Sequence, residues 1–145
     1  MYRVIPIIVF LSSLSAGCSK SGPPIAPVDG VVTYKGKPVP YAKVLFLPQK
    51  VPEGSTGVAL TDSEGKFSKV ITTGLSNNGA VVGSHIVTVT EGWPPDQEIP
   101  LDEMRQQKSP PRGPWAQKYR DSSNPALTVE VVAGQANHFE FDLSK

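Results

Sequence analysis

Few side chains in this protein have the chemistry of a catalytic centre. Its 145 residues include one cysteine, Cys18, and two histidines, His85 and His138. A catalytic nucleophile needs a base beside it, and no Ser-His-Asp or Cys-His set can be assembled from these residues. The sequence also contains neither a Gly-rich phosphate loop nor an HExxH motif. We therefore expect no catalytic residues and a protein that is not an enzyme.

Acidic residues gather in two places where a metal ion could be considered. Asp62 and Glu64 share one turn. A second group follows the first tryptophan and comprises Asp96, Glu98, Asp102 and Glu103. Calcium needs six to eight converging oxygen ligands, and neither group has the spacing of an EF-hand. We expect these carboxylates to be solvated, with no metal site and no cofactor.

Cys18 lies where a thiol has a chemical use. Arg3 gives a short positive region, residues 4–14 form an uncharged and mostly apolar run, and the three residues before the cysteine are small. This layout is typical of a secretory signal peptide, and it is too short for a permanent membrane-spanning helix. A free thiol in an exported protein would be prone to oxidation, whereas an acylated one would not.

The residues before Cys18 resemble a bacterial lipobox, in which signal peptidase II cleaves before a cysteine that carries diacylglycerol. Ser15 replaces the leucine that is usual three residues before the cysteine, and Leu14 lies one place earlier. The resemblance implies a lipoprotein signal peptide over 1–17, lipidation of Cys18 with palmitate-type acyl chains, and a flexible, proline-rich tether over 18–27.

Such an anchor would make the protein a membrane-anchored lipoprotein of the cell envelope, periplasmic or surface-facing. An ordinary signal peptide cut near Ala16 and an uncleaved anchor are the alternatives. The formal net charge is +1, which gives no electrostatic reason to expect nucleic acid or an anionic membrane surface as the main partner. We expect the membrane as a partner through the anchor, with an envelope protein or a glycan as a further candidate.

From Val28 onward, short segments of alternating polarity are separated by turn residues. The clearest period of two occurs near the end of the chain, over 127–132 and 138–143. Such alternation indicates antiparallel sheet with one packed face. About seven short strands separated by turns predict an all-β protein, a seven-stranded antiparallel β-sandwich over 28–145 with one long Pro-rich loop.

Earlier segments fit the same plan. Alternate residues over 42–46 share one apolar face, and a further strand begins at Val58. That strand leads into the turn TDSEG, where Asp62 is suited to accept hydrogen bonds from the amides that follow it. His85 falls on an inward face and His138 on an outward one. We expect His85 to be a packed residue with a hydrogen-bonded ring.

A family resemblance runs through four stretches of the sequence. VDGVVTYKGKPVPYAKVLFLP resembles the opening of carboxypeptidase regulatory-like domains, also called transthyretin-like or prealbumin-like. TDSEGKFS matches their T-D-x-x-G-x-F turn, and GAVVGSHIVTVT resembles their G-x-Y-x-V-x-V strand, with His85 in place of tyrosine. KYRDSSNPALTVEVVAGQANHFEFDL is similar to the end of short bacterial lipoproteins that carry this domain alone. The resemblance implies a non-catalytic, seven-stranded prealbumin-like or Ig-like sandwich on the cell envelope.

One branch of the transthyretin-like proteins, the hydroxyisourate hydrolases, is enzymatic. That branch uses two histidines, an arginine and a C-terminal Tyr-Arg-Gly-Ser. In this chain Tyr119 and Arg120 are internal and precede Asp121, while the C-terminus reads FDLSK. A transthyretin-like hydrolase therefore ranks last among the functions considered.

Residues 92–125 form a long, proline-rich loop in an otherwise economical sequence. Long loops in compact domains are often functional, and aromatic and arginine side chains dominate interface energetics. This loop carries five such residues, Trp93, Arg105, Arg112, Trp115 and Tyr119. In one interpretation the tryptophans fold back as a lid over a sheet edge, in keeping with a structural or interaction role. In the other they contact a partner, which would make the protein a glycan- or peptide-binding accessory module.

Overall fold

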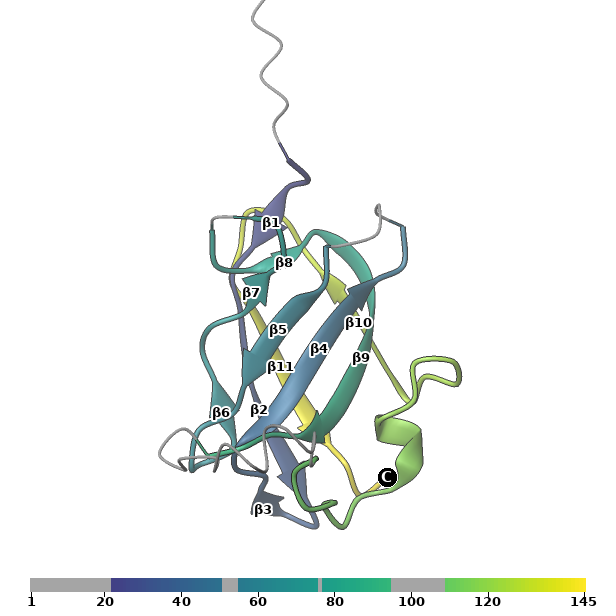
Figure 1. Cartoon of the computed structure of the whole chain (residues 1–145). Coiled ribbons are helices and arrows are strands. Elements are labelled where there is room, and N and C mark those ends of the chain that lie inside the picture. The colour runs from purple at the N-terminus through teal and green to yellow at the C-terminus, as the bar shows by residue number, and fades with distance from the viewer. Residues whose placement is uncertain (1–21, 51–54, 76, 95–108) are drawn as a thin grey trace, which may run out of the picture.

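The computed structural model describes residues 22–50, 55–75, 77–94 and 109–145, and these form an all-β protein (Figure 1). One 3-10 turn, η1 (Gln117–Tyr119), is the only helical element in the described ranges. The strands are β1 (Ile25–Ala26), β2 (Val28–Tyr34), β3 (Lys37–Pro38), β4 (Ala42–Pro48), β5 (Gly57–Leu60), β6 (Lys66–Phe67), β7 (Ile71–Thr72), β8 (Ala80–Val81), β9 (Gly83–Glu91), β10 (Leu127–Val131) and β11 (Asn137–Asp142).

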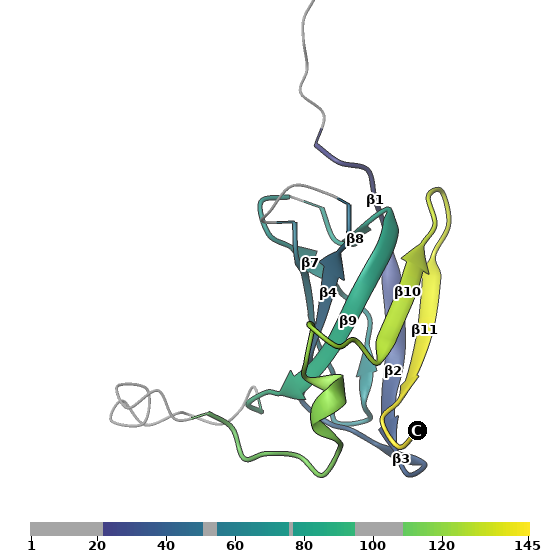
Figure 2. The ribbon, with the colours of Figure 1, turned by 90° about the vertical axis from the view of Figure 1, so that its right-hand side faces the viewer.

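Most of these strands belong to two sheets. Five strands pair in the order β10-β9-β4-β5-β7, and a second sheet has the order β11-β2-β3 with β6 also pairing with β2. A short β1–β8 pair forms a third sheet. Figure 2 views the two larger sheets nearly edge-on, with β4 and β9 on one side and β2 and β11 on the other. The arrangement is β-sandwich-like.

Aromatic rings fill the space between the two larger sheets. Phe46 of β4 is fully buried, and its ring centroid lies 6.0 Å from that of Phe67 and 6.3 Å from those of Phe139 and Phe141 in the facing sheet. Val131 at the end of β10 is also buried. The alternation read from residues 127–143 is confirmed, because its apolar positions face this core.

The expectation of a wholly antiparallel fold is wrong at one pairing. β11 runs parallel to β2, with register from Asn137 beside Val28 to Asp142 beside Thr33. The strand before it, β10, pairs antiparallel with β9 in the other sheet. The turn between β10 and β11 therefore carries the chain from one large sheet to the other. As a result β11 lies beside β2 rather than beside β10.

Asn137 fixes this crossing turn. The residue is 5% exposed, and its side-chain oxygen accepts a hydrogen bond from the Val132 amide at 2.9 Å. Its side-chain nitrogen lies 3.1 Å from the carbonyl oxygens of Val132 and Gln135, and 3.2 Å from that of Pro27. One buried side chain thus joins both arms of the turn to the segment between β1 and β2.

The turn between β5 and β6 forms as the sequence predicts. The Asp62 carboxylate accepts hydrogen bonds from the backbone amides of Glu64, at 2.8 Å, and Lys66, at 2.9 Å. Gly65 follows with a φ of +73°, and a Cβ there would lie 2.6 Å from the Val32 carbonyl oxygen. The turn therefore needs glycine both for its backbone conformation and for its close approach to β2.

The described strands begin earlier than the predicted boundary at residue 28. Ile25 and Ala26 form β1, and Ala26 is 1% exposed within the core. Their partner strand is β8, with Ile25 beside Val81. The predicted signal peptide and Cys18 lie outside the described residues. In the parts of the chain that the structure describes, no helix has the length and hydrophobicity that a membrane span requires.

Candidate functional site

The segment 109–120 covers a sheet edge that no strand covers. Pairing between β9 and β10 ends where Leu127 meets Val87, so no strand of the described residues pairs with the last residues of β9 on that side. Trp115 occupies this position, and its indole nitrogen donates a hydrogen bond of 3.2 Å to the Val89 carbonyl. Tyr119 in η1 donates its hydroxyl hydrogen to the Lys145 carbonyl. Trp115 therefore covers this edge of β9, while Tyr119 ties η1 to Lys145.

Both of these aromatic side chains belong to the core. Trp115 is 7% exposed and Tyr119 is 3% exposed. Arg112 is exposed, Trp93 is partly buried, and Arg105 lies outside the described residues. The structure therefore joins Trp115 and Tyr119 in one packed unit and does not bring Arg112 into it. These two rings contribute to the closed end of the domain rather than to an exposed aromatic surface.

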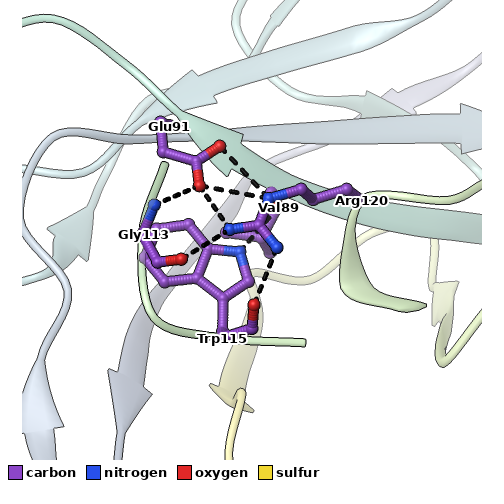
Figure 3. A network of polar contacts seen from close by, with 5 residues as sticks. All are labelled: Val89, Glu91, Gly113, Trp115 and Arg120. Atoms are coloured by element: carbon purple, nitrogen blue, oxygen red, sulfur yellow. Dashed lines mark hydrogen bonds and ion pairs between the residues drawn. The ribbon is translucent and has the colours of Figure 1, made fainter. Parts of the chain in front are cut away.

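An ion pair holds the segment in place (Figure 3). The guanidinium of Arg120 bonds to both carboxylate oxygens of Glu91, with Nε–O distances of 3.1 and 3.2 Å, and its Nη2 pairs with Oε1. The same guanidinium donates to the carbonyls of Trp115, at 2.7 Å, and Gly113, at 3.0 Å. It also lies 4.8 Å from the Trp115 ring centroid. One arginine thereby links the end of β9 to both ends of the turn at 113–115.

The surroundings of Glu91 in its ion pair with Arg120 favour the ionised carboxylate. Burial by itself raises the pKa of Glu91, but hydrogen bonds from Arg120 and from the Gly113 amide outweigh it and hold the pKa below its usual value. The side chains of Arg120 and Glu91 are 7% and 15% exposed. Each charge is therefore satisfied by the other, and neither is available to an external substrate.

Sequence reasoning missed this pair. Arg120 was considered only as part of a hydrolase signature, and Glu91 was not singled out. A carboxylate that ends an apolar strand, followed by an arginine close to a tryptophan in the next loop, is the one available signal. It is a weak signal, because a loop has no periodicity from which a contact could be inferred.

An open, largely apolar pocket of about 250 Å³ is lined by Trp115 and by residues of β3 and the turn after it. Figures 1 and 2 show β3 at the end of the domain opposite β1. We call this pocket the end pocket. It is lined by Tyr34, Lys37, Pro38, Val39, Pro40, Pro114 and Trp115. Such a concave surface, with two aromatic rings and one cationic side chain, is suited to holding a small ring or a short extended chain.

The two histidines do not meet. His85 is 1% exposed on the inner face of β9, with Nδ1 2.9 Å from the Gly83 carbonyl oxygen and Nε2 without a hydrogen-bond partner. Its burial lowers its pKa, which favours the neutral form of the ring in the folded protein. His138 lies on the outer face of β11 and pairs with Asp29. The histidines therefore belong to different sheets and environments.

No metal centre is built from the described part of the chain, in which no three histidine, cysteine, aspartate or glutamate side chains converge. Asp62 is engaged by its own turn, and Glu64 forms an ion pair of 2.8 Å with Lys66. The second acidic group, 96–103, lies outside the described residues.

The fold and the site together define an all-β protein with a closed sheet end and an adjoining shallow pocket. Comparisons with family models, with curated proteins and with solved structures found no match. The family resemblance read from the motifs therefore stays a prediction.

Proposed function

We propose that this protein is a non-catalytic lipoprotein of the cell envelope, anchored through Cys18, with a structural or interaction role. The observation that carries the proposal is the position of the single cysteine, directly after an apolar run and three small residues. The domain's geometry is compatible with this, because the described chain enters β1 at one end of the molecule (Figure 1). An anchor there would leave the end pocket pointing away from the attachment point.

We further propose the seven-stranded, prealbumin-like or Ig-like form of the β-sandwich. Several of the eleven strands in the described residues are short pieces that follow one another after one to three residues without pairing with each other, namely β1 and β2, β3 and β4, β6 and β7, and β8 and β9. If each such pair is counted as one extended segment, seven segments result. The succession of these segments supports a carboxypeptidase regulatory-like domain.

Lipidation is tested by expressing the full chain in a bacterium supplied with labelled palmitate. We expect label in the wild type and none in Cys18→Ser. Mass analysis of the mature N-terminal fragment should show that it starts at Cys18 and carries acyl chains. An unlabelled wild type that is released in soluble form, or a mature N-terminus elsewhere, would contradict the anchor.

The end pocket supports a second candidate function, a glycan- or peptide-binding accessory module. Trp115 lines the pocket, so its fluorescence should respond to a bound ligand. Soluble cell-wall glycan fragments and a proline-rich peptide are suitable probes, because both present faces that stack on aromatic rings. Lys37→Ala should weaken binding, whereas Lys43→Ala, which removes a lysine outside the pocket lining, should not. Unchanged fluorescence with both probes would remove this candidate.

A further inference from the structure

The outer face of the five-stranded sheet is unusually apolar. Strand pairing places Leu45 beside Val58 and Val58 beside Ile71, so these residues form a row across β4, β5 and β7. Leu47 lies beside Ile86 in the next strand, on the same side. Figure 1 shows this face turned toward the viewer. We call it the outer apolar face, and it comprises Leu45, Leu47, Val58, Leu60, Ile71 and Ile86.

Two of these side chains are strongly exposed. Leu60 is 45% exposed and Ile71 is 54% exposed. Both line an open hollow of about 480 Å³, and among the described residues its charged lining side chains are Lys43 and Lys69. A contiguous apolar surface is the kind of surface that meets a partner. The charges beside its exposed β5–β7 part are positive, while Glu130 of β10 lies at the far side of the same sheet face and is bonded to Ser84. Here the partner must be apolar at its centre and negatively charged around it.

The chain's N-terminal segment leaves the domain on the same edge. Gly22 packs against Leu75, which follows β7 closely in the sequence. Only three residues lie between Cys18 and Gly22, and the four Cα–Cα steps joining the two span at most about 14 Å when fully extended. A lipid attached to Cys18 therefore keeps a membrane close to the edge of the sheet that carries Ile71.

We propose that the outer apolar face lies on the anionic membrane surface that holds the anchor. This inference rests on the proposed lipidation of Cys18. Leu60 and Ile71 contact the boundary of the acyl chains, while Lys43 and Lys69 contact lipid phosphates. The long aliphatic stems of Lys43 and Lys69 allow their ammonium groups to reach the lipid headgroups. The domain then lies on its side rather than standing away from the bilayer.

With only two lysines, the outer apolar face binds an anionic membrane too weakly to stay there without the anchor. Each lysine near an anionic surface strengthens binding about fivefold, and the pair about 30-fold. Such a surface gives weak binding to a free domain, but the anchor makes the second contact intramolecular and so raises its effective concentration. A second copy of the chain is a poorer occupant, because a twofold interface here would bring Lys43 and Lys69 of both copies together.

The experiment uses the full lipidated chain in vesicles of phosphatidylglycerol and phosphatidylcholine. A nitroxide is attached at Ile71→Cys on the outer apolar face, or at Glu140→Cys as a matched exposed position on the opposite sheet. Collisions with a water-soluble nickel chelate report exposure to water. We expect accessibility at position 71 to fall at least threefold in these vesicles relative to vesicles of phosphatidylcholine alone, while position 140 is unchanged.

The charge requirement is tested in the same vesicles. The double substitution Lys43→Gln with Lys69→Gln should restore accessibility at position 71. The double substitution Lys35→Gln with Lys37→Gln, which removes the same charge from the β2–β3 segment of the other sheet, should not.

Three results would overturn the proposed docking, and they differ in whether the proposed lipid anchor is overturned as well. If the protein is acylated and floats with the vesicles while positions 71 and 140 stay equally accessible, the docking is wrong and the anchor stands. If position 71 is protected regardless of lipid charge and in proportion to protein concentration, a second copy is the occupant. If Cys18 is not acylated, the proposed function and the docking fail together.

Discussion

Removal of Arg120 is the most direct test of how the segment 109–120 is held. In Arg120→Met the long apolar stem is kept and the guanidinium is lost. Glu91 then stays largely buried without its counter-ion, and the carbonyls of Gly113 and Trp115 lose their charged donor. Breaking a buried ion pair from one side costs about 3–5 kcal/mol. Because this pair lies near the surface, we expect the lower end, about 3 kcal/mol.

The assay is unfolding in urea, followed by tryptophan fluorescence and by circular dichroism. A lower midpoint with an unchanged slope would report a loss of stability without a change in compactness. Lys118→Met is the matched control, because Lys118 is an exposed cation in the same turn that lies over the Tyr119 ring. It should change the free energy of unfolding by less than about 0.5 kcal/mol.

A double-mutant cycle separates the pair from the other contacts of Arg120. Glu91→Leu combined with Arg120→Met leaves no uncompensated charge, so it should be more stable than the sum of the two single losses predicts by about 1 kcal/mol or more. Additive losses, or a cost below about 1 kcal/mol for Arg120→Met alone, would refute the proposed role of the pair.

The pH dependence of the same pair has a definite sign. The folded-state pKa of Glu91 lies below its ordinary value of 4.5. The pair therefore stabilises the fold fully above about pH 4.5, and this contribution is lost as the pH falls through the folded-state pKa. Arg120→Met should lack this part of the acid-induced loss of stability, whereas Lys118→Met should retain it.

Three further predictions concern the core. Asn137→Ala should cost about 3 kcal/mol in urea unfolding, because it leaves buried groups of the crossing turn unpaired; a loss below about 1 kcal/mol would contradict that role. A Cβ in Gly30→Ala would lie 2.1 Å from the Phe139 carbonyl oxygen and 2.7 Å from the Phe67 ring, so thermal unfolding should show a loss above about 2 kcal/mol; near-wild-type stability would show that β2 and β11 can separate freely. In the wild type His85 stays neutral when buried, so stability should fall as the pH drops below its ordinary pKa of 6.5; His85→Phe should remove that fall, and an unchanged pH profile would exclude His85 as its cause.

The sequence predicted the strands well because their signal is local. The alternation that places Val129, Val131, Phe139 and Phe141 toward the core requires only that each strand have one packed face. The same is true of the turn at Asp62, where one side chain and the following amides determine the geometry. Features that depend on a few consecutive residues can be read without knowledge of the rest of the chain.

Features that depend on distant partners could not be read in this way. Nothing in the alternation of β11 distinguishes a parallel neighbour from an antiparallel one, so the pairing with β2 was missed. The loop presented Trp115 and Tyr119 without periodicity, so whether they faced the core or a partner was left open. On β4, Leu45 and Leu47 alternate with the core residues Val44 and Phe46, so both faces of the strand are apolar. The sequence of the strand therefore did not indicate which face would be left uncovered.

The parallel pairing of β11 with β2 has a consequence for the order of events in biosynthesis. The Asn137 side chain bonds to Pro27 across 110 positions, so β2 lacks β11 as its neighbour until residues 137–142 have been made. Topologies dominated by such distant contacts fold slowly. A nascent chain of this kind would stay open while its middle strands are made, and its domain would close only after β11 had been added.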